Sequence, residues 1–367
     1  MKKNKTISRY SLFALQILFF GGSAGYVYPS LIIRSTESAY WMPIVLWALL
    51  ALIGVWLYKL AFDQTSTTLV KSLQHKLGLI LTILLTAPVM LFIVGVGVVM
   101  LRAYTEMISM TMLPSTPIPF LNGLIVVPVF MAWAGIMPII RSARVFFLLT
   151  LMVSIFLMFL GLSDIQLSLG SPWLRTNGDF FKSIHFYQSS YLWSGFVFIA
   201  LFKPYTGEAV KRFWQPAALA ICCVLPLILG VVYLPILTFG PELSKQLILP
   251  YVSKMDSIYY YWIVFENMTA VLVSNMMIYV LLSLSLKLHV LGKMIIEIFP
   301  EAKKSWVYIT LGIIVYSAAN LVPSWRELEN LMYMMTFPTL YAMFAFPLIA
   351  LIVFQISNFA KRRKDDV

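Results

Sequence analysis

Residues 12–33, LFALQILFFGGSAGYVYPSLII, decide the fold of this chain. The stretch is apolar and long enough to cross a bilayer, whose hydrocarbon core of about 30 Å needs about 20 helical residues. It also contains Gly21-Gly22-Ser23-Ala24-Gly25 near its middle, followed by Pro29. Glycine costs about 1 kcal/mol and proline about 3 kcal/mol in a helix interior, so the span is predicted to unwind there. Unwound backbone cannot face lipid, and it must therefore face protein or a wet cavity.

A second span has an abnormal composition. Residues 181–203 end in an apolar run, but their first half carries lysine, histidine, glutamine and serine side chains. We predict a half-helix, a break at Ser194 and Gly195, and a second half-helix that ends near Phe202.

The chain has ten apolar runs of membrane-spanning length. They are residues 10–33, 41–60, 78–101, 118–140, 145–163, 181–203, 215–239, 258–286, 305–323 and 336–358. Most of the 27 Lys and Arg residues lie in the gaps on the side of the N-terminus, Lys287 and Lys293 among them, whereas Arg102 is placed in a gap on the other side. Because positive residues that flank spans favour the cytoplasmic side, both termini are predicted to be cytoplasmic.

Composition agrees with a polytopic, all-α membrane protein. Hydrophobic residues make up 60% of the chain, charged residues 11%, and the mean hydropathy is +0.87. No gap is long enough for a soluble domain, so residues 1–367 are predicted to form one transmembrane domain. We interpret the net charge of +12 as a consequence of the membrane topology, in which positive residues flank the spans on the cytoplasmic side and attract anionic lipid. It is not interpreted as a sign of nucleic-acid binding. We expect no cleavable signal peptide.

Interrupted spans at positions one and six of ten suit a five-plus-five inverted repeat. In such folds, small ligands bind at the membrane midplane where the two breaks meet. The sequence therefore predicts a ligand site between spans one, three, six and eight. The alternative is that the glycine cluster only lets helices pack closely.

Both breaks offer polar groups to an amino-acid ligand. The unwound backbone of Gly21, Gly22, Ser23, Ala24 and Gly25 can donate N–H groups to a carboxylate, helped by the positive end of the inner half-helix. Ser190, Ser194 and the carbonyls near Gly195 can accept from an ammonium group. Tyr191 can wall the ligand side chain, or it can belong to the aromatic belt at the membrane interface.

Glu266 is the carboxylate that lies well inside an apolar span. Such a residue usually faces a cavity or a partner, so Glu266 is a candidate for a ligand contact, a proton site or a structural hydrogen bond. The alternative is a protonated acid that Asn267 or Thr269 satisfies. The three histidines, His75, His185 and His289, show no metal-binding spacing, and we expect neither catalysis nor a metal or other cofactor.

Several short motifs resemble those of one family. Gly22, Ala24 and Pro29 stand on the pattern G-x-G-x-x-x-x-P, with alanine for the second glycine. The stretch Leu113-Pro114-Ser115-Thr116-Pro117 precedes span four, and Gly135, Ile136, Ile139 and Arg141 follow the pattern G-I-E-x-I-x-R, with Met137 for the glutamate. Asp164 and Pro172 follow span five, and Glu266 lies early in span eight with Asn267 and Thr269 where the family often has Arg and Asp. In these motifs and their order, the chain resembles the spore germination permeases, the GerAB-type B subunits of nutrient germinant receptors in the amino acid–polyamine–organocation superfamily.

The resemblance implies a LeuT-like fold and residence in the inner membrane of a dormant spore. It also implies assembly with an A-type subunit and a lipoprotein C-type subunit. The resulting hypothesis is a nutrient sensor that binds an amino acid, or a sugar or nucleoside, and triggers germination. The alternative is a proton-coupled amino acid transporter in which Glu266 couples the proton.

Overall fold

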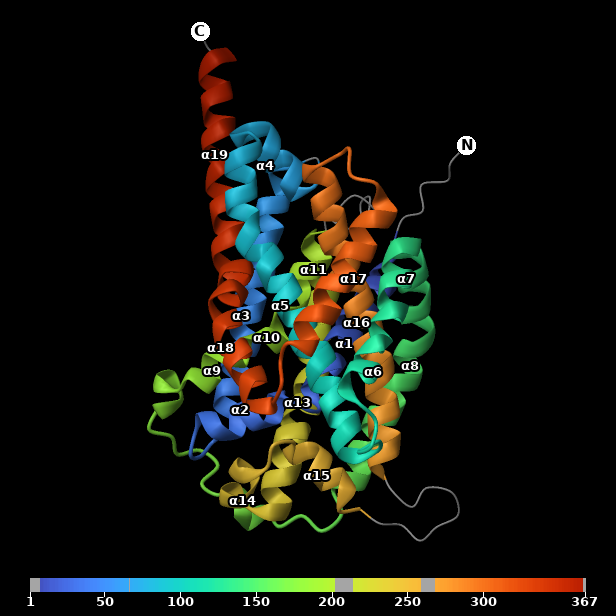
Figure 1. Cartoon of the computed structure of the whole chain (residues 1–367). Coiled ribbons are helices and arrows are strands. Elements are labelled where there is room, and N and C mark those ends of the chain that lie inside the picture. The colour runs from blue at the N-terminus through green and yellow to red at the C-terminus, as the bar shows by residue number, and fades with distance from the viewer. Residues whose placement is uncertain (1–6, 66, 202–213, 259–267, 366–367) are drawn as a thin grey trace.

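The computed structural model describes residues 7–65, 67–201, 214–258 and 268–365, and in these residues every regular element is a helix. Six described helices are long and apolar enough to cross a membrane: α3 (Trp41–Asp63), α5 (Leu79–Thr111), α8 (Ile136–Gly161), α13 (Trp214–Phe239), α16 (Met268–Ile298) and the continuous run Trp325–Ser357. They stand side by side, and both ends of the chain lie at one end of the bundle (Figure 1), which we call the terminal side. The other end is called the opposite side.

Shorter helices make up the remaining four spans. Span one consists of α1 (Arg9–Ala24) and α2 (Tyr28–Ser35), and span six of α9 (Ile184–Gln188), α10 (Ser190–Trp193) and α11 (Gly195–Leu201). Span four consists of α6 (Ile118–Asn122), a 3-10 turn (Gly123–Ile125) and α7 (Val126–Ala134), and span nine is α17 (Lys304–Asn320).

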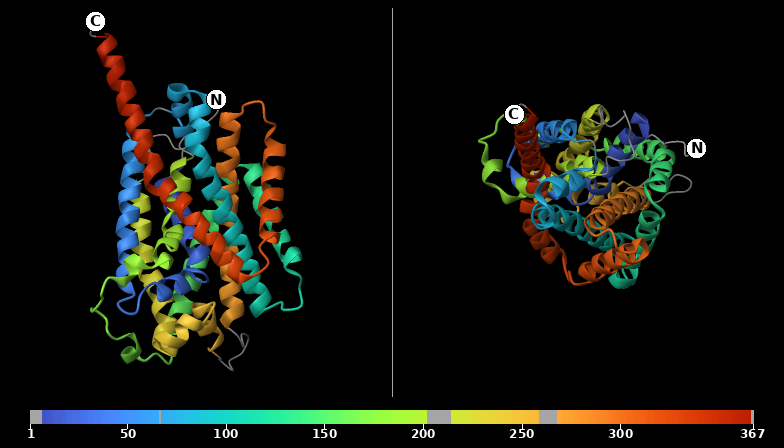
Figure 2. Two further views of the ribbon diagram at one scale, coloured as in Figure 1. Left: turned by 60° about the vertical axis from the view of Figure 1, so that its left-hand side comes forward. Right: turned by 90° about the horizontal axis from the view of Figure 1, so that it is seen from above.

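Span ten, one of the six long spans, joins α18 (Trp325–Leu340), a π-helical turn (Tyr341–Ala345) and α19 (Phe346–Asp365), which projects beyond the bundle (Figure 2). The predicted all-α fold with interrupted first and sixth spans is confirmed.

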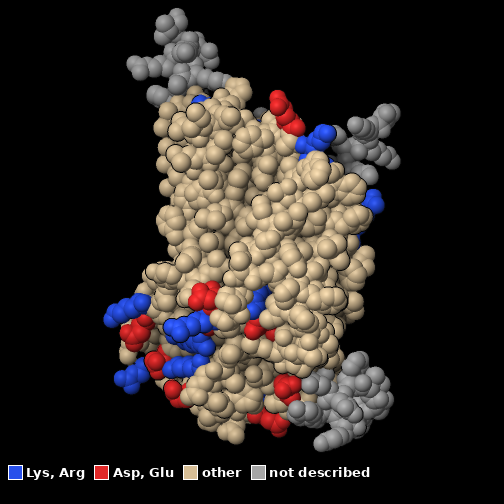
Figure 3. Space-filling model, in the orientation of Figure 1, with Lys and Arg blue, Asp and Glu red and all other residues tan. Residues whose placement is uncertain are grey.

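Short helices cover the two ends of the bundle. α4 (Leu69–Leu77) lies on the terminal side, and α14 (Pro241–Gln246) and α15 (Pro250–Asp256) lie on the opposite side (Figure 1). The connection after span five holds two 3-10 turns, Leu167–Gly170 and Asp179–Lys182. Charged side chains gather toward the two ends of the face in Figure 3, and uncharged residues form the belt between them. Large apolar side chains such as Leu84, Met152 and Phe159 are more than half exposed, as expected where helices face lipid.

The break in span one differs from the prediction, because residues 21–24, which were predicted to unwind, form the last turn of α1, and the helix is interrupted only at residues 25–27. α1 continues to Ala24, Gly25 is its C-cap, and α2 begins at Tyr28 with Pro29 in its first turn. Proline is tolerated in a first helical turn because the N–H that it lacks would have no helical partner there. Pro29 therefore starts the second half-helix.

Span six is interrupted twice, at Ser189 and at the predicted position Ser194. The Ser189 hydroxyl donates to the carbonyl of Phe186 at 2.6 Å, and the Ser194 hydroxyl donates to the carbonyl of Tyr191 at 2.6 Å. Each serine therefore donates a hydrogen bond to a carbonyl of the preceding turn beside an interruption. In apolar surroundings such a carbonyl needs a partner.

Several span boundaries differ from the prediction. Spans four and five meet at Gly135, whose φ of 111° is a conformation that favours glycine, instead of in a gap at residues 140–145. Span eight runs to Ile298, so Lys287 and Lys293 lie within α16 and not in a gap. Arg102 likewise lies within α5 and is only 2% exposed. A charged residue does not end a helix when its side chain has partners in the bundle.

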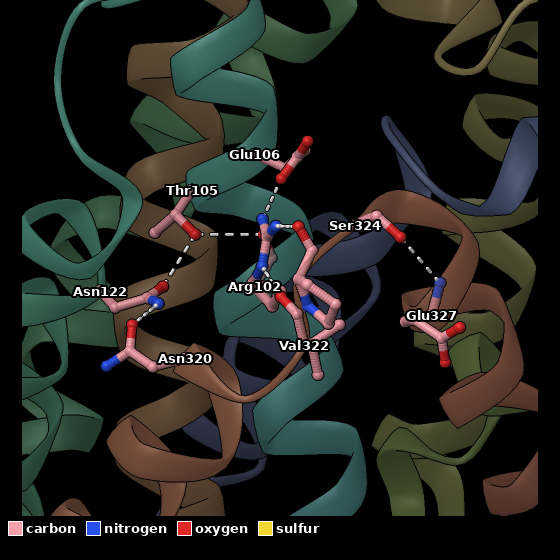
Figure 4. A network of polar contacts seen from close by, with 9 residues as sticks. Arg102, Thr105, Glu106, Asn122, Asn320, Val322, Ser324 and Glu327 are labelled. Atoms are coloured by element: carbon pink, nitrogen blue, oxygen red, sulfur yellow. Dashed lines mark hydrogen bonds and ion pairs between the residues drawn. The ribbon is translucent and has the colours of Figure 1, made fainter.

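Arg102 ties α5 to the connection between α17 and α18 (Figure 4). Its Nε donates to the carbonyl of Val322 at 2.9 Å, and its Nη1 pairs with Glu106. Beside it, the Asn122 amide accepts from the Thr105 hydroxyl and donates to Asn320, each at 2.8 Å. This polar network holds α5, α6 and α17 together near the opposite side.

Candidate functional site

A cavity in the described residues lies beside the break in span one. Its volume is about 60 Å³. Gly21 and Ala24 of α1 and the C-cap Gly25 line it together with side chains of α8, α13, α15 and α16. The cavity therefore lies between spans one, five, seven and eight, and spans three and six of the predicted location do not contribute to its wall.

One wall of the cavity is polar. Asn275 of α16 donates through Nδ2 to the Ser154 hydroxyl of α8 at 3.0 Å and to the carbonyl of Thr150 at 3.4 Å. The hydroxyl of Tyr279 lies 3.2 Å from the Ser154 hydroxyl. These bonds fix the Asn275 amide and leave its Oδ1 as the remaining hydrogen-bonding atom of that side chain. Among the residues that the structure describes, no charged side chain lines this wall or the rest of the cavity.

Two glycines of α1 make room for side chains of α16. A Cβ on Gly21 would overlap the ring of Tyr279, and a Cβ on Gly25 would overlap the terminal methyl of Met276. Tyr279 and Met276 also line the cavity. The glycine cluster thus serves close packing, as the alternative interpretation held, and the same packing shapes the cavity wall.

The half-helix dipoles at this break differ from the prediction. α1 points its C-terminal end at the break, and α2 points its N-terminal end there. The N-terminal end of a helix is positive, so the positive end belongs to α2 and not to the inner half-helix. Carbonyl groups of the last turn of α1 and N–H groups of the first turn of α2 lack helical partners.

The predicted residues of span six lie apart from the cavity. The Ser190 hydroxyl is buried without a hydrogen-bond partner, the Ser194 hydroxyl bonds to its own chain, and Gly195 faces Gln16 and Phe19 of α1. Tyr191 lines a second, much smaller cavity of about 10 Å³ with residues of α5, α9 and α18. Ligand contact by these four residues stays a prediction.

The two interrupted spans do meet. Trp193 of α10 donates through Nε1 to the Tyr28 hydroxyl of α2 at 3.0 Å, and both side chains are fully buried. Of the other predicted residues, Gly22 and Ser23 belong to α1, and only their backbone is described. Glu266 lies outside the described residues.

An ion pair joins spans one and ten. Arg34, in the last turn of α2, pairs with Glu329 of α18 at 2.7 Å, and Trp325 donates to the same carboxylate oxygen at 3.0 Å. Gln188 of α9 donates to the carbonyl of Glu329 at 3.4 Å. Both charged side chains of the pair are partly exposed, so the pair is worth at most about 1 kcal/mol.

Asn275, Ser154 and Tyr279 were missed by sequence reasoning. A signal existed, because Asn275 is an isolated polar residue inside an apolar span, and such residues usually face the bundle. In the described part of the chain, no group of three or more His, Cys, Asp or Glu residues could hold a metal.

Comparisons with known proteins agree with this architecture. A family model described as "Spore germination protein" matches residues 6–323. A Na⁺-coupled sialic acid symporter in a substrate-bound outward-open state has a TM-score of 0.64 at 13% identity, over 94% of this chain and 82% of its own. MhsT in complex with L-phenylalanine has a TM-score of 0.65 at 13% identity, over 96% of this chain and 89% of its own. These likenesses show the fold, and the predicted LeuT-like architecture is confirmed. No curated protein sequence matches the chain.

Proposed function

Because this chain belongs to the spore germination protein family, we propose that it is the nutrient-sensing subunit of a spore germinant receptor. It is an integral membrane protein with a permease-like fold. In this proposal it resides in the inner membrane of the spore with both termini in the cytoplasm. Its partners are an A-type subunit and a lipoprotein C-type subunit, and its ligand is a small amino acid that binds in the cavity beside the break in span one.

The volume of the cavity supports a small ligand. A water molecule needs about 10–15 Å³ on this measure, so 60 Å³ holds roughly four to six non-hydrogen atoms. Glycine and alanine have about that many atoms. The described residues of the lining carry no charge, which favours a molecule without net charge, and a zwitterionic amino acid meets this condition.

The polar groups around the cavity suit the two ends of an amino acid. The first turn of α2 begins three residues after Gly25, the last residue of span one that lines the cavity. In this proposal its N–H groups and the positive end of its dipole stabilise the carboxylate from beside the cavity. Asn275 Oδ1 and the carbonyls at the end of α1 can accept from the ammonium group. The apolar remainder of the lining leaves room for a short side chain.

Binding acts on the receptor by favouring one conformation. A ligand shifts an equilibrium only by its difference in affinity between the two states. A nutrient that bridges α1, α2 and α16 binds best where the break in span one lies close to α16. The A-type partner then converts that state into germination.

The alternative is an amino acid transporter that uses the same cavity. The two solved structures named above are complexes with small molecules, one of them a Na⁺-coupled symporter, and this favours the alternative. Uptake of labelled alanine into liposomes by this chain alone supports transport. Binding without uptake supports sensing.

The test of the cavity is the binding of labelled alanine and glycine to the purified chain in lipid nanodiscs. Asn275→Leu is expected to weaken binding by about tenfold or more, because it removes the acceptor for the ammonium group and the bond to Ser154. The matched control is Ser274→Leu, at the neighbouring exposed position, which is expected to bind normally. Equal binding by both variants contradicts the proposed site.

A further inference from the structure

Lys287 is a lysine whose side chain is buried inside the bundle. It lies in α16, one of the membrane-spanning helices, and is only 2% exposed. Its Nζ donates to the Ser283 hydroxyl at 2.6 Å and to the Met100 sulfur at 3.3 Å. Among the described residues, no carboxylate lies within ion-pair distance of it. Ionisable residues inside a membrane are rare and usually functional, so this position needs an explanation.

Two aromatic rings complete the surroundings of the Lys287 ammonium group. Nζ lies 4.0 Å from the ring centroid of Phe19 and 5.2 Å from that of Phe198. The two rings stack on each other at 4.6 Å, and Phe198 also stacks on Phe92 at 5.3 Å. A cation within about 6 Å of an aromatic face is attracted to it, most strongly where water is excluded.

The ring contacts come from the two interrupted spans. Phe19 belongs to α1, and Phe198 belongs to α11. Met100 adds α5, so the ammonium group joins spans one, three and six to span eight. Spans one, three, six and eight are also the four spans between which the sequence predicted a ligand.

Among the described residues, the polar side chain at the contact between α1 and α11, that of Gln16, makes no hydrogen bond. Gln16 of α1 lies beside Gly195 of α11, and neither atom of its buried amide has a partner. An uncharged Met or Leu at position 287 would fill an apolar junction without the cost of burying a charge. A lysine at this position therefore points to a role for its ammonium group.

We propose that Lys287 is a positioning residue whose ammonium group occupies a cation site formed by Phe19, Phe198, Met100 and Ser283, and thereby holds α1 and α11 against α16. The proposal concerns how the two interrupted spans are held together. It does not depend on the identity of the nutrient or on nutrient binding.

The first test removes the charge and keeps the shape. The reporter is Ala200→Cys, two residues after Phe198 on α11, in a Cys222→Ser, Cys223→Ser background, and its reaction with a water-soluble thiol reagent is timed in nanodiscs. Ala200 is 2% exposed, so reaction requires α11 to separate from its neighbours. Lys287→Met is expected to speed the reaction by about tenfold or more, and Lys287→Arg to keep it slow because the cation is retained.

A matched reporter separates this effect from general loosening. Ala132→Cys lies on α7, is fully buried, and belongs to a helix that packs against α8, α16 and α17. Lys287→Met is expected to leave its reaction unchanged and to leave the midpoint of thermal unfolding equal or higher. Slow reaction at position 200 in Lys287→Met overturns the proposal, and so does equal acceleration at both reporters.

The second test refills the cation site. Lys287→Ala removes the part of the side chain that n-propylammonium replaces, and 1-propanol is its uncharged counterpart of similar size. Millimolar n-propylammonium is expected to restore slow reaction at Ala200→Cys, whereas 1-propanol is not. Equal protection by both compounds, or by neither, shows that the charge is not what holds α11.

Discussion

The phenol ring of Tyr279 occupies the space that a Cβ atom on Gly21 would need. Tyr279 lies on α16 and Gly21 on α1, and both line the cavity beside the break in span one. The close approach of these two helices therefore depends on a residue without a side chain.

We expect Gly21→Ala to weaken the binding of a small amino acid by about tenfold or more. The new methyl group must displace the Tyr279 ring, because a core at native density has no spare volume beside it. The displaced ring disturbs the contact with Ser154 that forms the polar wall. Equilibrium binding of labelled alanine in nanodiscs measures the effect.

Gly97→Ala is the control for this change. A Cβ on Gly97 meets only the Leu284 side chain at 3.8 Å, an ordinary contact. This variant should bind alanine normally and gain up to about 1 kcal/mol of stability from helix propensity. Similar binding losses in both variants would indicate that the packing of Tyr279 has no special role.

Met276→Ala should change the size of the ligand that fits. The Met276 side chain lines the cavity and fills the space beside Gly25. Its truncation removes three heavy atoms, so valine or leucine should gain affinity relative to alanine, by up to about tenfold if the added methylenes are buried. Competition of unlabelled amino acids against labelled alanine provides the measurement. An unchanged order of affinities would contradict a role for Met276 in ligand selection.

Asn122→Leu should destabilise the protein by about 1–2 kcal/mol, the range measured for hydrogen bonds between membrane helices in model peptides. The substitution removes the bonds to Thr105 and Asn320 within the network of Figure 4. The midpoint of unfolding in detergent gives the change. Asn122→Leu combined with Asn320→Leu should cost less than the sum of the two single variants, because the two amides bond to each other. Strict additivity would mean that their bond contributes nothing.

Lys254 should make stability depend on pH. It lies in α15 on the opposite side, is 1% exposed, and donates to the carbonyl of Ser163 at 2.9 Å. Burial lowers the pKa of its ammonium group, and nearby Asp164 partly opposes this. The folded state therefore binds the proton less tightly than the unfolded state, and the resulting penalty is fully present below the lowered pKa. As the pH rises toward the ordinary value of about 10.4, the penalty is relieved and stability rises.

The comparison that checks this is wild type against Lys254→Arg from about pH 7 to about pH 10. Arginine stays charged throughout, so its penalty is not relieved. The free energy of unfolding of wild type should increase relative to that of Lys254→Arg as the pH rises. A difference that does not change with pH would show that Lys254 keeps its charge.

Local sequence features predicted the two interruptions, because their causes are local. Glycine near residue 25 and a polar stretch before residue 195 weaken a helix wherever it packs. The partners of these residues could not be predicted in the same way. Gly21 meets a ring 258 residues later in the chain, and nothing near Gly21 encodes that contact.

Lys287 shows how a local sequence feature led to a wrong prediction. A lysine after an apolar run predicts the end of a span, since a charge in lipid is costly. The cost falls when aromatic faces from other helices surround the charge, and those helices are distant in sequence. For the same reason the cavity between spans one, five, seven and eight was not foreseen, although three of its lining residues, Gly21, Ala24 and Gly25, were among the candidates.

The hydrogen bond between Trp193 and Tyr28 has a mechanical consequence. It couples the two helices that are weakest along their length, at the points where each can bend. If α2 tilts when a ligand binds in the cavity, α10 must move with it or the buried hydrogen bond between Trp193 and Tyr28 must break. Strain that starts on one half of the repeat would thus reach the other half directly, without passing through the rigid helices around them.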